Sequence, residues 1–231
     1  MRPVLSVGLG VVDLLVVCGN IFVLYILCSQ KCLRSSTNSL VLSLTISDLL
    51  LGLLILPFSI MQEHRGRWGY GEPFCGVWLS LDVWFSTASI YNLLAISIDR
   101  YMAVQQPIRY PIISSKRVVR LLISLVWCSS LGLSCLPWLI SLKGVDSHGR
   151  CSPLHFPDSY IITSALFSFI LPAVLMAYDT CRIDTCVPSG VFTFTFWLGY
   201  ANSAVNPMLY AAFSRDFRAA FRRILFRPRY V

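Results

Sequence analysis

The residue with the clearest chemical potential in this chain is Asp82, an acid inside the apolar stretch 75–104. An ionised carboxylate within a bilayer costs at least about 2.5 kcal/mol, so it must face a protein interior or a water-filled cavity. Ser86 and Ser89 share its helical face. The base in the same stretch, Arg100, follows Asp99 roughly 26 Å further along the helix axis, at the opposite membrane edge. Asp82 must therefore find its partner elsewhere.

A second acid, Asp48, lies about 15 Å into the apolar stretch 39–61, close to the middle of a membrane. A carboxylate at this depth needs a partner.

The composition shows what kind of molecule must position these acids. The chain has 231 residues, of which 56% are hydrophobic and only 13% charged, and its mean hydropathy is +0.68. Soluble domains have about 25% charged residues, so this is a multi-span membrane protein. The net charge of +8 comes from bases between the apolar stretches and at the C-terminus. That distribution is typical of cytoplasmic connectors and does not indicate a nucleic-acid surface.

Six apolar stretches are long enough to cross a bilayer, so we predict one all-α domain, a multi-span transmembrane helical bundle. They cover about residues 4–28, 39–61, 75–104, 118–140, 160–178 and 190–212. The polar segment 179–189 between the last two has the composition of an outer loop.

Several motifs resemble those of rhodopsin-like G protein-coupled receptors of the biogenic-amine group. Cys75, Asp82 and the triplet Asp99-Arg100-Tyr101 are spaced as in the third helix of those receptors. The sequences Trp197-Leu198-Gly199-Tyr200 and Asn206-Pro207-Met208-Leu209-Tyr210 resemble their seventh helix, and residues 213–226 resemble their short amphipathic helix on the inner membrane surface. Two simpler interpretations stay open: Asp82 as a structural acid, and the triplet as a helix-end salt bridge.

The resemblance implies a ligand, a small protonated amine that pairs with Asp82, as in trace-amine, histamine and serotonin receptors. Aromatic faces favour a cation. The implied pocket consists of Asp82, Trp78, Ser86, Ser164, Ser168, Phe169, Trp197 and Tyr200. Ser164 and Ser168, one turn apart and followed by Pro172, would read the polar end of a phenol or indole amine, although serines also serve as helix contacts.

The resemblance also implies a sodium ion, a G protein and a disulfide. The sodium site would comprise Asp48, Ser89, Asn202, Ser203 and Asn206, with no other cofactor. A heterotrimeric G protein would contact Asp99, Arg100, Tyr101, Pro107, Ile108 and Tyr210, although Pro107-Ile108 could also be a simple turn. Cys75 would pair with Cys151 across an oxidising outer face. Other cysteines, such as Cys18, Cys128 and Cys135, lie within spans and are expected to pack inside.

One part of the receptor pattern is missing. No stretch matches the sixth helix with its Cys-Trp-x-Pro signature, or the long third inner loop, so the fold is a seven-helix type with one helix missing. Six spans would place both ends on one side, and no orientation then puts every basic connector in the cytoplasm. The alternative fold is the same bundle with its last span inverted.

Two functions follow. The first is an amine receptor of the plasma membrane, embedded in the bilayer, that signals through heterotrimeric G proteins. The second is a truncated or splice-variant product that does not signal, and that misfolds, stays in the endoplasmic reticulum or associates with intact receptors as a dimer. We expect no enzyme, because His64, His148 and His155 are scattered over loops and no nucleophile elbow or phosphate loop occurs. A transporter is disfavoured because no internal repeat appears.

Overall fold

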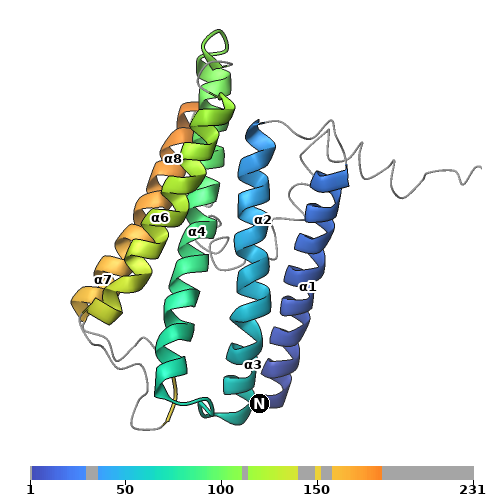
Figure 1. Cartoon of the computed structure of the whole chain (residues 1–231), viewed down its shortest axis with the longest axis vertical. Coiled ribbons are helices and arrows are strands. Elements are labelled where there is room, and N and C mark those ends of the chain that lie inside the picture. Colours follow the sequence, from blue (N-terminus) through green and yellow to red (C-terminus); the bar gives the residue numbers. More distant parts are fainter. Residues whose placement is uncertain (1, 30–35, 111–113, 140–148, 152–157, 184–231) are drawn as a thin grey trace, which may run out of the picture.

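The computed structural model describes residues 2–29, 36–110, 114–139, 149–151 and 158–183, which form a bundle of long helices (Figure 1). Within these residues, five helical stretches are long and apolar enough to cross a membrane: Ser6–Ser29, Asn38–Arg65, Glu72–Gln105, Lys116–Leu136 and Asp158–Met176. The prediction of an all-α transmembrane bundle is confirmed for this part of the chain. The predicted span 190–212, its inverted alternative and the helix 213–226 lie outside the described residues.

The first two spans pack closely because a glycine lies where they meet. Helix α1 (Arg2–Ser29) contacts α2 (Ser36–Leu54) beside the buried Gly52. A Cβ atom at Gly52 would lie 2.9 Å from Val17 Cγ2 and 3.1 Å from Val16 Cγ1, which is too close. Small residues let membrane helices approach in this way.

A proline interrupts the second span. Helix α2 ends at Leu54, and α3 (Leu56–Arg65) begins after a one-residue break at Ile55. Pro57 has no N–H to donate to the carbonyl four residues earlier, which explains the break and agrees with the kink expected of a proline. Gly66, with φ of 71°, ends α3 in the left-handed conformation.

Helix α4 (Glu72–Gln105) lies at the centre of the bundle and carries the predicted Asp82. It contacts α2 on one side and α6 (Lys116–Leu139) and α8 (Leu171–Ile183) on the other (Figure 1). Groups on α4 can therefore meet groups from the second, fourth and fifth spans.

The fifth span differs from the prediction in two ways. It consists of α7 (Asp158–Ala165), a π-helical turn η3 (Leu166–Ile170) and α8, so its helix is not uniform. It also continues to Ile183, whereas residues 179–189 were predicted to be an outer loop. That prediction was wrong for Asp179 to Ile183, because polar residues do not stop a helix and no glycine or proline occurs there.

The cysteines within the spans face outward. Cys18, Cys28, Cys128 and Cys135 are exposed on the bundle surface and carry free thiols. The expectation that Cys18, Cys128 and Cys135 pack inside the protein was therefore wrong. In a membrane, lipid is as suitable a neighbour as a protein core for a small apolar side chain, so hydrophobicity alone does not reveal the inward face.

Candidate functional site

Asp82 is half-buried on α4, and its carboxylate accepts no hydrogen bond from any residue that the structure describes. Ser86, one turn later, directs its hydroxyl to the helix backbone instead. Its Oγ donates to the Asp82 carbonyl at 2.6 Å and lies 3.3 Å from the Val83 carbonyl. The described part of the bundle thus leaves the negative charge of Asp82 available for a partner.

Trp78 lies one turn before Asp82 and is buried near the outer end of α4. Its indole Nε1 donates to the Ile55 carbonyl at 3.3 Å, next to the break between α2 and α3. Its ring centroid lies 5.0 Å from that of Trp68, a residue of the outer turn that follows α3. Trp78 therefore links the helix that carries Asp82 to the kinked second span, and its contact with an amine stays a prediction.

The serines of the fifth span differ in their surroundings. Ser164 lies on α7 and is half-buried, one turn after Tyr160. Ser168 lies in η3, and its hydroxyl oxygen is buried without a hydrogen-bond partner among the described residues. Phe169 follows in the same turn and is half-buried. Because a π turn holds more residues than an α turn, it changes the direction of these two side chains relative to a regular helix.

The deeper pair of the predicted sodium site comes together in the structure. Ser89 Oγ of α4 donates to Asp48 Oδ1 of α2 at 2.6 Å, and both residues are buried. A carboxylate and a hydroxyl oxygen are ligands that suit a hard cation. The other three predicted ligands, Asn202, Ser203 and Asn206, lie outside the described residues.

At the inner end of α4, the side chains of Asp99 and Arg100 lie in different surroundings. Asp99 is buried and accepts hydrogen bonds from Tyr110 Oη, at 3.1 and 3.2 Å, and from Ser114 Oγ at 3.2 Å. Arg100 is exposed and forms no ion pair with any described residue. The interpretation as a helix-end salt bridge was therefore wrong, because neighbours in a helix do not face each other.

The residues predicted to contact a G protein are accessible to different degrees. Tyr101 is half-buried, and Pro107 is exposed in a turn after α4. The side chain of Ile108 is 92% exposed, which leaves it free to insert into a partner. Tyr210 lies outside the described residues. Both interpretations of Pro107-Ile108 are compatible with this exposed turn.

The predicted disulfide between Cys75 and Cys151 is present, with the two Cα atoms 5.7 Å apart. It fixes the outer end of α4 to a loop residue far along the chain. Cys75, Cys151 and the neighbouring Trp68 and Trp78 are buried in one hydrophobic cluster. This cluster includes residues of α4 on both sides of Asp82 along the helix, among them Trp78 and Phe85.

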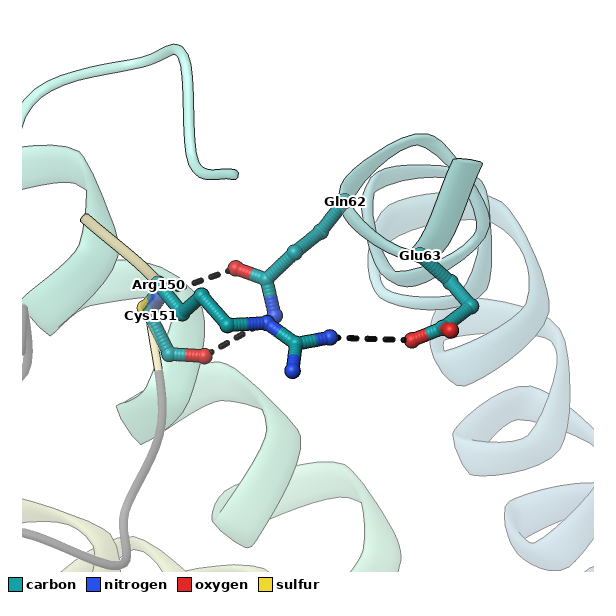
Figure 2. Close-up of polar contacts among 4 residues, drawn as sticks. All are labelled: Gln62, Glu63, Arg150 and Cys151. Carbon is teal, nitrogen blue, oxygen red and sulfur yellow. Dashed lines mark hydrogen bonds and ion pairs between the residues drawn. The ribbon is translucent and has the colours of Figure 1, made fainter. Parts of the chain in front are cut away.

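A second set of contacts, which sequence reasoning missed, holds the same loop. Figure 2 shows the Gln62 side chain bonded to both backbone groups of Cys151: Nε2 donates to the carbonyl at 3.0 Å and Oε1 accepts from the N–H at 2.9 Å. Beside it, Arg150 forms an ion pair with Glu63 at 3.2 Å. We call Gln62, Glu63, Arg150 and Cys151 the outer clamp. No sequence signal could have found it, since the bonded residues are 87 to 89 positions apart.

Comparison with known proteins gives one family and several relatives. A family model described as 7 transmembrane receptor (rhodopsin family) matches residues 19–187. The Histamine H2 receptor of Homo sapiens is 31% identical over 283 residues, which cover 95% of this chain and 79% of that receptor.

Two invertebrate proteins are also similar. The probable G-protein coupled receptor No9 of Amphibalanus amphitrite is 41% identical over 192 residues, covering 79% of this chain and 40% of that protein. The Octopamine receptor beta-1R of Drosophila melanogaster is 28% identical over 306 residues, covering 94% of this chain and 60% of that receptor.

Proposed function

The chain belongs to the rhodopsin family of seven-transmembrane receptors, and on this premise we propose that it binds a small protonated amine at Asp82. The family is one of multi-pass membrane receptors and not of enzymes. The observation that carries the proposal is the half-buried carboxylate of Asp82, which no described residue neutralises. An ammonium group in this place would remove the cost of an unpaired charge in the membrane.

The rest of the pocket would recognise the ring of the amine. Ser168 offers a buried hydroxyl without a partner in the described chain, and Phe169 is its neighbour. A phenol or indole amine carries a ring hydroxyl or N–H that could bond to this serine, so we favour these amines over an imidazole. Trp197 and Tyr200 would add aromatic faces, and Tyr200 would donate to Asp82.

The names of the relatives agree with a biogenic amine and leave its identity open. One relative is named for histamine, an imidazole amine, and another for octopamine, a phenol amine. The serine in η3 is the feature that favours the phenol class for this chain. We further propose that Asp48 and Ser89 hold a sodium ion, and that the turn with Pro107 and Ile108 docks on a G protein at the plasma membrane.

Competition binding on membranes that contain the chain tests the ligand class. The membranes are labelled with a tritiated phenol amine such as tyramine, and three unlabelled competitors are added: tyramine, histamine and tyrosol. Tyrosol has the same ring as tyramine but a neutral hydroxyl in place of the ammonium. We expect tyramine to compete best, histamine at least tenfold less well, and tyrosol not at all. Equal competition by tyrosol would contradict an ionic anchor, and better competition by histamine would contradict the phenol assignment.

A second candidate function is a receptor product that does not signal. The alignment with the human relative runs over 283 residues although the chain has only 231, so that receptor has residues within the matched region that lack a counterpart here. The absence of a Cys-Trp-x-Pro segment from the sequence agrees with a deletion around the sixth helix. Such a chain could bind an amine, or a second receptor, without transmitting a signal.

A further inference from the structure

The π turn in the fifth span is followed directly by a proline, which removes one backbone donor from the helix. The Leu171 N–H bonds to the Leu166 carbonyl, five residues earlier, which is the hydrogen-bond pattern of a π-helix. The next bond in this pattern would join residue 172 to the carbonyl of Phe167. Residue 172 is a proline and has no N–H, so this bond cannot form. Lipid offers no substitute donor for such a carbonyl.

Tyr91 of α4 supplies the missing donor. Its hydroxyl donates to the Phe167 carbonyl at 3.1 Å, across 76 residues of sequence. Helix α4 contacts η3 directly, and Tyr91 is half-buried at that contact. A phenylalanine at this position could fill the same space, but it could not satisfy the carbonyl. The specific contribution of Tyr91 is thus its hydroxyl group.

The bonded carbonyl belongs to the residue just before the two side chains that we assign to the ligand. Ser168 and Phe169 follow Phe167 in η3, and their directions depend on whether the turn is π or α. Asp82 and Ser86 lie on the same helix as Tyr91. One helix therefore carries the proposed ammonium anchor and also holds the turn that would read the ring.

We propose that Tyr91 is a positioning residue of the amine site: its hydroxyl holds the π turn and so fixes where Ser168 and Phe169 point. This inference rests on the proposed function for its ligand, but the state of the turn can be measured without one.

Hydrogen–deuterium exchange of the chain in lipid nanodiscs measures the state of the turn. In Tyr91→Phe we expect the amides of residues 166–171 to exchange about fivefold faster, since a net hydrogen bond of about 1 kcal/mol corresponds to that factor. The amides of α1 and α2 should be unchanged. Tyr25→Phe is the matched control, because Tyr25 is an exposed tyrosine on α1. Unchanged exchange in residues 166–171 of Tyr91→Phe would overturn the proposal.

A second substitution tests the cause. Pro172→Ala returns an N–H to the helix, so the Phe167 carbonyl no longer depends on Tyr91. In this background we expect Tyr91→Phe to have no further effect on exchange in residues 166–171. If Tyr91→Phe raises exchange equally with proline or alanine at position 172, the hydroxyl does not act through the carbonyl and the proposal fails.

The link to the ligand is tested by comparing tyramine with phenethylamine, which lacks the ring hydroxyl. Tyr91→Phe should reduce the affinity for tyramine about fivefold more than the affinity for phenethylamine, because only tyramine has a hydroxyl to bond to Ser168. Equal losses for both amines would overturn the positioning role. If the unaltered chain binds neither amine, the proposed function fails, and the exchange measurements alone decide whether Tyr91 holds the turn.

Discussion

Asp13, like Asp82, is an acid within a described transmembrane helix, but of these two only Asp82 was assigned a role from sequence. Asp13 lies on α1, and its Oδ1 is buried without a partner among the described residues. It faces α2, where a Cβ atom at Gly52 would approach it to 3.6 Å. Because both acids are in apolar surroundings but on different helices, Asp13 serves as a control for substitutions at Asp82.

The bond between Asp48 and Ser89 leads to a prediction about salt. If sodium binds there, a sodium concentration of ten times the Kd stabilises the folded state by about 1.4 kcal/mol. That free energy raises Tm by about 3 to 6 °C in a domain of this size. We expect this rise when choline chloride is replaced by sodium chloride. Asp48→Asn should abolish the rise, because the neutral amide attracts a cation far less strongly.

The control is Ser130→Ala, which removes another buried hydroxyl, bonded within α6 to the Val126 carbonyl. It should keep the full response to sodium. A rise in Tm with sodium that persists in Asp48→Asn would show that the ion does not bind at this site.

At the residue scale, sequence predicted contacts only where a family pattern supplied both partners. Asp48 with Ser89 and Cys75 with Cys151 are such cases, and the structure contains both contacts. The donors to Asp99 and the bond from Tyr91 were not predictable, because each depends on how two helices or a loop and a helix are placed in space.

Among the elements, the loop that carries Cys151 is held by a disulfide and by the outer clamp. Gln62 makes two partly buried hydrogen bonds, each worth about 0.5 to 1.5 kcal/mol. The ion pair of Arg150 with Glu63 has side chains that are 42% and 30% exposed, and such pairs contribute about 0 to 1 kcal/mol. Gln62 should therefore hold the loop more strongly than Glu63.

This ranking can be measured with trypsin, which cleaves after Arg150 once the loop is released. With the disulfide reduced, we expect cleavage at Arg150 to be about fivefold to thirtyfold faster in Gln62→Ala, which corresponds to about 1 to 2 kcal/mol. Glu63→Gln should change the rate by less than about fivefold. A larger effect of Glu63→Gln than of Gln62→Ala would show that the ion pair is the stronger part of the clamp.

At the element scale, the described spans were predicted to within a few residues because long apolar stretches have one main explanation in a chain of this composition. Pro57 correctly indicated an interruption of the second span. Pro172 lies just after η3, and the sequence analysis did not predict the π turn there. The end of the fifth helix at Ile183 was missed because polarity was taken as a sign of a loop.

For the whole molecule, one helix, α4, carries the proposed amine anchor Asp82 and ends just before the turn that we propose to dock on a G protein. Signalling requires a second element that can occupy two positions. A ligand can only shift the equilibrium between conformations that the protein already has. The sequence contains no segment that matches the sixth helix, the element that performs this movement in receptors of this type. Arg100 is exposed and forms no ion pair with any residue in the described part of the chain.

We therefore predict that the 231-residue chain produces no amine-evoked second messenger and is largely retained inside the cell. The comparison is a version with the sixth helix of a related receptor inserted after Ile183. The inserted version should reach the cell surface at a higher level and respond to the amine. A robust response from the chain without the insertion would show that it signals by another movement.

The central claim, that Asp82 anchors a protonated amine, is tested most directly by saturation binding of tritiated tyramine to membranes with the inserted version. Removing one partner of a buried charge pair costs about 2 to 5 kcal/mol, so Asp82→Asn should raise Kd at least about thirtyfold. Asp13→Asn should leave Kd within about twofold. Unchanged binding in Asp82→Asn, or an equal loss in both variants, would contradict the account.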